Sequence, residues 1–134
     1  MRRRQLAHLR RQHLWVEGTS SVTQSHIAHA VDLPLNSFGY LLVSATTGNV
    51  NLAGGSQGRL CLGGSIGRYV GSIASSSFLG QISTSIDPTA LPQPTGSVAA
   101  LPGQTWHFQL WHRDAVGGFA TSNFTNGCGV TFTP

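Results

Sequence analysis

The chain has 134 residues, of which 40% are hydrophobic and only 9% are charged, and its formal net charge is +4. This length suits one domain that buries roughly two-thirds of its surface on folding. The 17 glycines favour a chain of short strands and tight turns over a helical bundle. Lysine is absent, which excludes a Walker A lysine, a Schiff-base lysine and a Ser–Lys catalytic pair.

The positive charge is concentrated at the N-terminus. Five of the eight basic residues lie within the first eleven positions, namely Arg2, Arg3, Arg4, Arg10 and Arg11. The body therefore carries 8 − 5 = 3 arginines against four carboxylates, or 3 − 4 = −1. We expect residues 1–17 to be an Arg-rich tail, disordered or a short helix, and residues 18–134 to be a single β-domain.

Short segments with alternating or continuous apolar character predict strands along the body. In chain order they cover residues 26–33, 38–44, 59–63, 66–70, 78–86 and 98–101. In the first of these segments Ile27, Val31 and Leu33 share one parity. Residues 47–58 and 88–94 are predicted loops, the second because its three prolines do not fit a central strand.

The last thirty residues give the clearest strand pattern. Trp106, Phe108 and Leu110 alternate with more polar neighbours, which indicates a strand with one apolar face. After a break at residues 116–123, a second alternating segment follows around Cys128 and Phe132. The whole chain thus reads as seven or eight short strands without βαβ alternation. We predict an all-β fold, an antiparallel β-sandwich with a basic N-terminal tail.

A candidate ligand face lies on the polar parity of the strand that begins near Trp106. It consists of His107, Gln109, Trp111 and Arg113. An aromatic ring among hydrogen-bonding side chains on a sheet is typical of glycan- and peptide-binding faces, because the ring stacks and the polar groups orient the ligand. The alternative is that Trp111 packs under a loop or a neighbouring domain.

The sequence contains two matches to the nucleophile pattern G-x-S-x-G, centred on Ser56 and Ser65. Asp87 and then His107 or His112 follow them in the chain order of many hydrolases. That pattern needs a strand-to-helix turn, and no helix is predicted after Gly67. A serine hydrolase built on Ser65 is therefore a minor alternative, and we predict that the protein is not an enzyme.

No cofactor or metal site is predicted. His26 and His29 fall on opposite faces of a strand, and His112 with Asp114 supplies only two ligands where a lasting site needs three or four. The cysteines, Cys61 and Cys128, are predicted to point to opposite sides of their strands. A disulfide between them is the less favoured interpretation.

The chain also resembles a domain found near the C-termini of large secreted proteins of environmental bacteria. Four segments carry the resemblance: SFGYLLVS at 37–44, GGSQGRLCLGGSIGRYVG at 54–71, WHFQLWHRD at 106–114 and ATSNFTNG at 120–127. It covers about residues 32–134. The resemblance implies an extracellular β-domain and brings no active-site residues with it.

The N-terminal segment does not read as a secretory signal, because it lacks a run of 7–15 apolar residues and a small-residue cleavage site. No segment approaches the ~18 apolar residues that span a bilayer. The lack of a signal agrees with the expected extracellular or cell-surface location if the chain is a fragment or if its start is misassigned. The other interpretation is that the Arg-rich arm is a functional part of the protein.

The leading hypothesis is a non-enzymatic extracellular module for adhesion, surface display or domain contact. Its expected partners are a glycan or protein at the cell surface and other domains of a larger parent chain. The main alternative is a nucleic-acid-associated coat or binding protein that uses the five arginines of the arm to neutralise phosphates. The slight negative charge of the body weakens that alternative.

Overall fold

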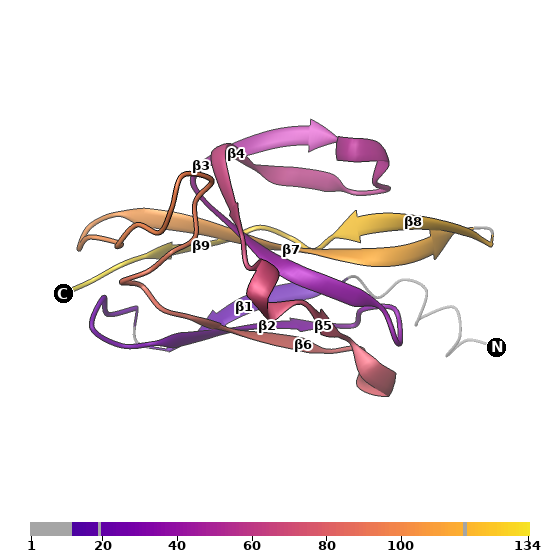
Figure 1. Ribbon diagram of the computed structural model, residues 1–134, viewed down its shortest axis with the longest axis horizontal. Coiled ribbons are helices and arrows are strands. Elements are labelled where there is room, and N and C mark those ends of the chain that lie inside the picture. The colour runs from indigo at the N-terminus through magenta and orange to yellow at the C-terminus, as the bar shows by residue number, and fades with distance from the viewer. Residues whose placement is uncertain (1–11, 19, 117) are drawn as a thin grey trace.

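The computed structural model describes residues 12–18, 20–116 and 118–134. This described part forms nine strands in two antiparallel sheets, one of three strands and one of six, which face each other (Figure 1). The predicted all-β antiparallel sandwich is confirmed. Residues 1–11, with the five arginines of the predicted tail, lie outside the described residues.

The smaller sheet has the order β1 (His13–Glu17), β2 (His26–Val31), β6 (Ile82–Ile86). The predicted inward face of β2, the one that carries Ile27, is wrong. Ala28 and Ala30 are buried, whereas Ile27 is 40% exposed. Ala30 stands in register between Leu14 of β1 and Ile82 of β6. These two larger side chains occupy the core on either side of the small alanine.

The predicted domain boundary after residue 17 is also wrong. His13–Glu17 pairs along its whole length with β2. Leu14 is 1% exposed, and its backbone N–H and C=O both bond to the side-chain amide of Asn126, at 2.8 and 3.1 Å. The strand is short and follows a basic segment, so its two inward side chains, Leu14 and Val16, were too few to mark it in the sequence.

The larger sheet contains six strands: β4 (Arg59–Arg68), β3 (Phe38–Asn51), β7 (Thr105–Val116), β8 (Phe119–Phe124), β5 (Ala74–Ser75) and β9 (Cys128–Thr131). The first four stand in that order, while β5 pairs with β3 and β9 pairs with β7. Three short 3₁₀ helices interrupt the connections: η1 (Ala53–Gly55), η2 (Val70–Ser72) and η3 (Ser77–Leu79). Within the described residues, no helix is long and apolar enough to cross a membrane.

Several predicted element limits need correction. β3 continues through residues 47–51, which were predicted as a loop, and register shifts between Ser44 and Thr46 and between Thr47 and Val50 bend it. The two strands predicted around Gly63–Gly64 are one strand, because Gly64 adopts a positive φ of 62° without ending the pairing. β8 lies in the predicted break.

The predictions for residues 78–86 and 98–101 hold only in part. The strand β6 begins at Ile82, and Phe78 belongs to η3, where it is 77% exposed instead of facing the core. Residues 98–101 form no strand, and Val98 makes only an isolated bridge with Leu91.

The core fills the space between the two sheets. From the larger sheet, β7 contributes Trp106, Phe108 and Leu110, all at most 6% exposed, as its alternation predicts. Leu41 and Val43 of β3 join them, and these side chains pack against the inward side chains of the smaller sheet. The residues of opposite parity on β3 and β7 consequently face away from the core.

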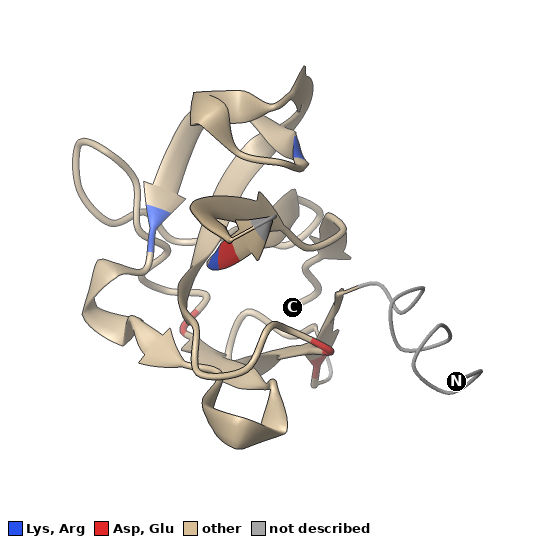
Figure 2. Ribbon diagram, turned by 90° about the vertical axis from the view of Figure 1, so that its right-hand side faces the viewer, with Lys and Arg blue, Asp and Glu red and all other residues tan. Residues whose placement is uncertain are grey.

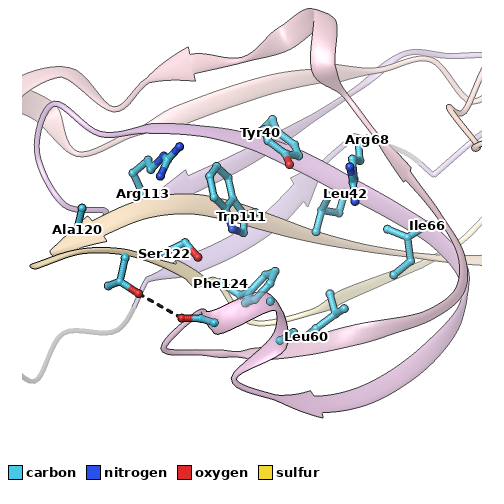
Figure 3. Close-up of a pocket in the computed structure, with 14 residues that line it drawn as sticks. Tyr40, Leu42, Leu60, Ile66, Arg68, Trp111, Arg113, Ala120, Ser122 and Phe124 are labelled. Carbon is cyan, nitrogen blue, oxygen red and sulfur yellow. Dashed lines mark hydrogen bonds between the residues drawn. The ribbon is translucent and has the colours of Figure 1, made fainter. Parts of the chain in front are cut away.

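The tip of the β3–β4 hairpin folds back over this outer face (Figures 1 and 3). The backbone N–H of Gln57 donates to the carbonyl of Ser122 in β8 at 2.8 Å, and the Ser56 hydroxyl donates to the same carbonyl at 2.9 Å. The bent hairpin and the outer face of the sheet therefore enclose a hollow between them.

Candidate functional site

The hollow beneath the hairpin tip has a volume of about 510 Å³, within the range of small-ligand pockets. We call it the aromatic groove and define it by five side chains: Tyr40, Arg68, Trp111, Arg113 and Phe124. They come from four adjacent strands of the larger sheet (Figure 3). Sheet residues hold their side chains more rigidly than loops do, so the groove has a pre-formed floor.

Three aromatic residues form a row across the sheet. Tyr40 of β3 stands opposite Trp111 of β7, and Trp111 stands opposite Phe124 of β8. Directly paired residues place their side chains on the same face of a sheet. The Tyr40 and Trp111 ring centroids are 5.2 Å apart with the planes at 35°. The row therefore offers a continuous apolar surface on the outer face.

Two guanidinium groups accompany the rings. The Cζ atom of Arg113 lies 5.5 Å from the centre of the Trp111 ring, a cation–π distance. Arg68 of β4 pairs with Leu42, which lies two residues beyond Tyr40 in β3. Figure 3 shows Trp111 and Tyr40 between the Arg113 and Arg68 side chains.

The groove is positively charged. Among the described residues, no carboxylate lines it. Asp114 has the parity opposite to that of Arg113 in β7, and its carboxylate accepts bonds from the N–H of Ala115 at 2.8 Å and from Asn123 Nδ2 at 3.3 Å. The other three carboxylates belong to the smaller sheet or directly follow its strands, at Glu17, Asp32 and Asp87.

In Figure 2 most acidic positions lie at the smaller sheet and the basic positions in the larger sheet, where one acidic position, Asp114, adjoins Arg113 in β7. The three arginines of the described chain, Arg59, Arg68 and Arg113, all belong to β4 and β7 of the larger sheet. An anionic ligand approaching the groove therefore meets two guanidinium groups without a competing carboxylate in its lining.

One wall of the groove is backbone. Gly54 and Gly55 in η1 have positive φ values of 61° and 81°, and a Cβ atom added at either would meet no atom within 4 Å. The Thr121 hydroxyl donates to the carbonyl of Gly55 at 3.4 Å, which ties this wall to β8. Together with the bonds of Ser56 and Gln57 to Ser122, this bond holds the wall against β8.

The structure divides the four predicted ligand-face residues among three environments. Trp111 and Arg113 line the aromatic groove. Gln109 is fully buried, so it does not present its amide to solvent as the prediction requires. The start of β4 and the residue after β8 cover it: its Nε2 donates to the carbonyls of Arg59 and Thr125 at 2.8 and 2.7 Å, and its Oε1 accepts from the N–H of Cys61 at 2.8 Å.

His107 lies apart from the groove. It lines a separate hollow of about 300 Å³ together with Cys61 and Cys128. Both cysteines are free thiols. Cys128 packs against the core, and its burial raises the pKa of the thiol, while a backbone hydrogen bond with Val16 opposes that effect.

Sequence reasoning missed Tyr40, Arg68 and Phe124. Tyr40 lies on the same face of β3 as Leu42. Both faces of that strand carry apolar residues, so the sequence does not show which face points outward. Phe124 directly follows the predicted break at residues 116–123, and Arg68 falls in a short separate strand of the prediction. The signal that unites them is cross-strand register, which one strand's pattern does not contain.

The residues of the hydrolase pattern are not arranged around a strand-to-helix turn. Ser65 lies inside strand β4, and Ser56 is 1% exposed with its hydroxyl bonded to Ser122. His112 is buried in the core, and burial lowers its pKa more than the carbonyl of Arg113 and the charge of Asp114 raise it. Its Nδ1–H donates to that carbonyl at 3.1 Å.

In the described part of the chain, no three His, Cys, Asp or Glu side chains form a group able to hold a metal ion. His29 instead bonds to Glu17 at 2.6 Å and to Ser83 at 2.9 Å on the outer face of the smaller sheet. His26 is buried and bonds to the carbonyl of Ser21 at 2.8 Å.

Comparison of the chain with protein-family models, with curated proteins and with solved structures finds no match. Three rings and two guanidiniums on a rigid sheet offer stacking area and directional donors, which are the elements of a binding site.

Proposed function

We propose that the protein is a non-enzymatic β-sandwich module that binds a glycan in the aromatic groove and so serves adhesion or display at a cell surface. The observation that carries the proposal is the row Tyr40–Trp111–Phe124 in register across three strands, with Arg68 and Arg113 beside it. The extracellular setting is supported by the resemblance to domains of secreted bacterial proteins.

A sugar ring suits this arrangement because one of its faces is made of C–H groups and its rim of hydroxyls. Aromatic side chains present large, rigid apolar area at low conformational cost, and they therefore serve as stacking platforms. The guanidiniums supply several N–H donors each, which orient the hydroxyl-rich rim.

A glycan array with three forms of the full chain tests the proposal. Wild-type protein is compared with Trp111→Ala and with Trp15→Ala, which removes a 40% exposed ring from the outer face of the smaller sheet. We expect the wild type and Trp15→Ala to bind the same glycans and Trp111→Ala to lose them. An array without any bound glycan, or equal binding by all three forms, would contradict the proposal.

A second candidate function is contact with a further copy of the chain. Four apolar residues that are more than half exposed stand in or beside two connections: Leu35 and Phe38 at the β2–β3 connection, and Phe78 and Leu79 in the β5–β6 connection. Hydrogen bonds from the N–H of Leu33 to Gly80 and from that of Asn36 to Ser77 bring the connections together at one end of the sandwich. Exposed apolar patches mark protein contacts.

Sedimentation equilibrium tests this second candidate. It predicts that the full chain self-associates as its concentration rises and that the double variant Phe78→Ser, Leu79→Ser stays monomeric. A wild-type chain that is monomeric throughout would rule out self-association through this end of the sandwich.

A further inference from the structure

We infer that the glycan bound in the aromatic groove is acidic, and that Arg113 and Arg68 bind the carboxylates of its uronic acid units. The inference rests on the proposed function and names the ligand class of the same site. It is carried by the position of the two guanidiniums, by the absence of a carboxylate from the described lining of the groove, and by the spacing between the two charges.

Arginine is the side chain best suited to a planar carboxylate, because its fork of N–H donors makes two parallel bonds. Arg68 and Arg113 are both exposed at the groove and make no ion pair with any described carboxylate. Their donors are thus available to a ligand. The Trp111 ring beside Arg113 holds that guanidinium over the stacking surface, so one sugar unit can contact both.

The spacing of the charges sets the length of the ligand. Arg68 of β4 pairs with Leu42 of β3, which in turn pairs with Gln109 of β7. Arg113 lies four residues beyond Gln109 in β7. Arg68 and Arg113 are therefore separated by four residues along the strand direction and by two strand spacings across the sheet. In a flat sheet this separation is about 16 Å between Cα atoms. The span between the two Cα atoms is longer than one sugar ring, so an oligomer can engage both arginines without their side chains converging on one unit.

The same features disfavour two other polyanions. The described chain has three arginines and four carboxylates, 3 − 4 = −1, and lacks the basic stripe that nucleic acid requires. An extended acidic peptide commonly binds by pairing with a sheet edge. The groove lies on the face of the sheet, where Tyr40 and Trp111 belong to strands that are paired on both sides.

Isothermal titration calorimetry of the full chain with oligogalacturonides of one to six units tests the inference. The matched ligand is the same hexamer with its carboxyl groups reduced to alcohols. We expect the hexamer to bind at least tenfold more tightly than the monomer and the reduced hexamer, and the affinity to fall with added salt. A sulfated galactan hexamer separates recognition of a carboxylate from recognition of any anion.

Three variants assign the binding to the two arginines. Arg113→Gln and Arg68→Gln should each weaken hexamer binding about tenfold. Arg59→Gln is the matched control, because Arg59 is an exposed arginine of the same sheet that bonds to Asn51 at 2.9 Å and does not line the groove. This variant should bind within about twofold of the wild type.

The outcomes separate the inference from the proposed function. If the reduced hexamer binds as tightly as the acid and only Trp111→Ala loses binding, the groove is a glycan site and the acidic assignment is wrong. Equal or tighter binding of the sulfated hexamer, of single-stranded DNA or of polyglutamate also overturns the inference, provided that Arg113→Gln and Arg68→Gln weaken it and so place it in the groove and not on the N-terminal arginines. If neither hexamer binds and the glycan array is empty as well, the proposed function falls too.

Discussion

The side-chain carbonyl of Gln109 accepts a hydrogen bond from the backbone N–H of Cys61 at 2.8 Å. The bond links β7, in the middle of the larger sheet, to the hairpin strand β4 that folds over it. Two further bonds from the same amide reach the carbonyls of Arg59 and Thr125. A residue that the sequence places on a ligand face is therefore a buried residue that ties the hairpin strand to the sheet.

The first prediction concerns this amide. Gln109→Ala leaves one N–H and two carbonyls without their partner in a buried site, and we expect it to lower the free energy of unfolding by roughly 3 kcal/mol. Gln57→Ala, at an exposed position of the hairpin tip, should change it by less than about 0.5 kcal/mol. Urea denaturation of both variants checks this. Similar small losses for the two would contradict a role of Gln109 in holding the hairpin.

The two tryptophans of β7 should differ in their effect on stability. Trp106 is 6% exposed and packs in the core, so Trp106→Ala should cost about 3–5 kcal/mol. Trp111 is only partly buried on the outer face, and its replacement should cost much less. Chemical denaturation gives both values, and equal losses would show that the two faces of β7 have been misassigned.

Strand β1 should be an integral part of the fold. Leu14 is 1% exposed, so Leu14→Ala should destabilise the protein by roughly 2–5 kcal/mol. Leu52→Ala, at a position that is 62% exposed, serves as the control and should leave the melting temperature nearly unchanged. An unchanged melting temperature for Leu14→Ala would mean that β1 adds nothing to the core.

His112 should make stability depend on pH. Burial lowers its pKa in the folded state, so below the ordinary value of about 6.5 the unfolded chain takes up a proton that the folded chain resists. Stability is therefore present above that pH and is lost as the pH falls toward the folded pKa. His112 Nε2 also lacks a hydrogen-bond partner within the described chain.

The variant His112→Phe isolates this effect. It keeps a ring in the core and removes both the titration and the unpaired nitrogen, so its stability should fall less than that of the wild type between pH 7.5 and pH 5. Thermal melting across that range gives the comparison. Parallel curves for the two proteins would show that another group controls the acid sensitivity.

The sequence predicted the fold where alternation was strong and local. The pattern of Trp106, Phe108 and Leu110 identified β7 and its inward face. The parity of β2 was misjudged because alanines carry little hydrophobic signal, although Ala28 and Ala30 fill the narrow space beside larger neighbours. β1 and β8 were missed because each is short and bounded by basic or turn-forming residues.

The site was only half accessible to sequence reasoning. The parity of β7 correctly grouped Trp111 with Arg113 on the outer face. The bend of β3 at two register shifts covers Gln109, and the pairing of Arg68 with Leu42 places Arg68 at the groove. Such a bend depends on which residues of two strands pair, and this information lies in contacts between distant segments.

The most direct test of the account follows the three indole N–H signals of the full chain by ¹H–¹⁵N NMR during titration with the galacturonide hexamer. The chain has three tryptophans, and they occupy three environments: Trp15 on the outer face of the smaller sheet, Trp106 in the core and Trp111 in the groove. We predict that the Trp111 signal shifts and saturates while those of Trp15 and Trp106 stay in place. A shift of the Trp15 signal with an unmoved Trp111 signal would contradict it.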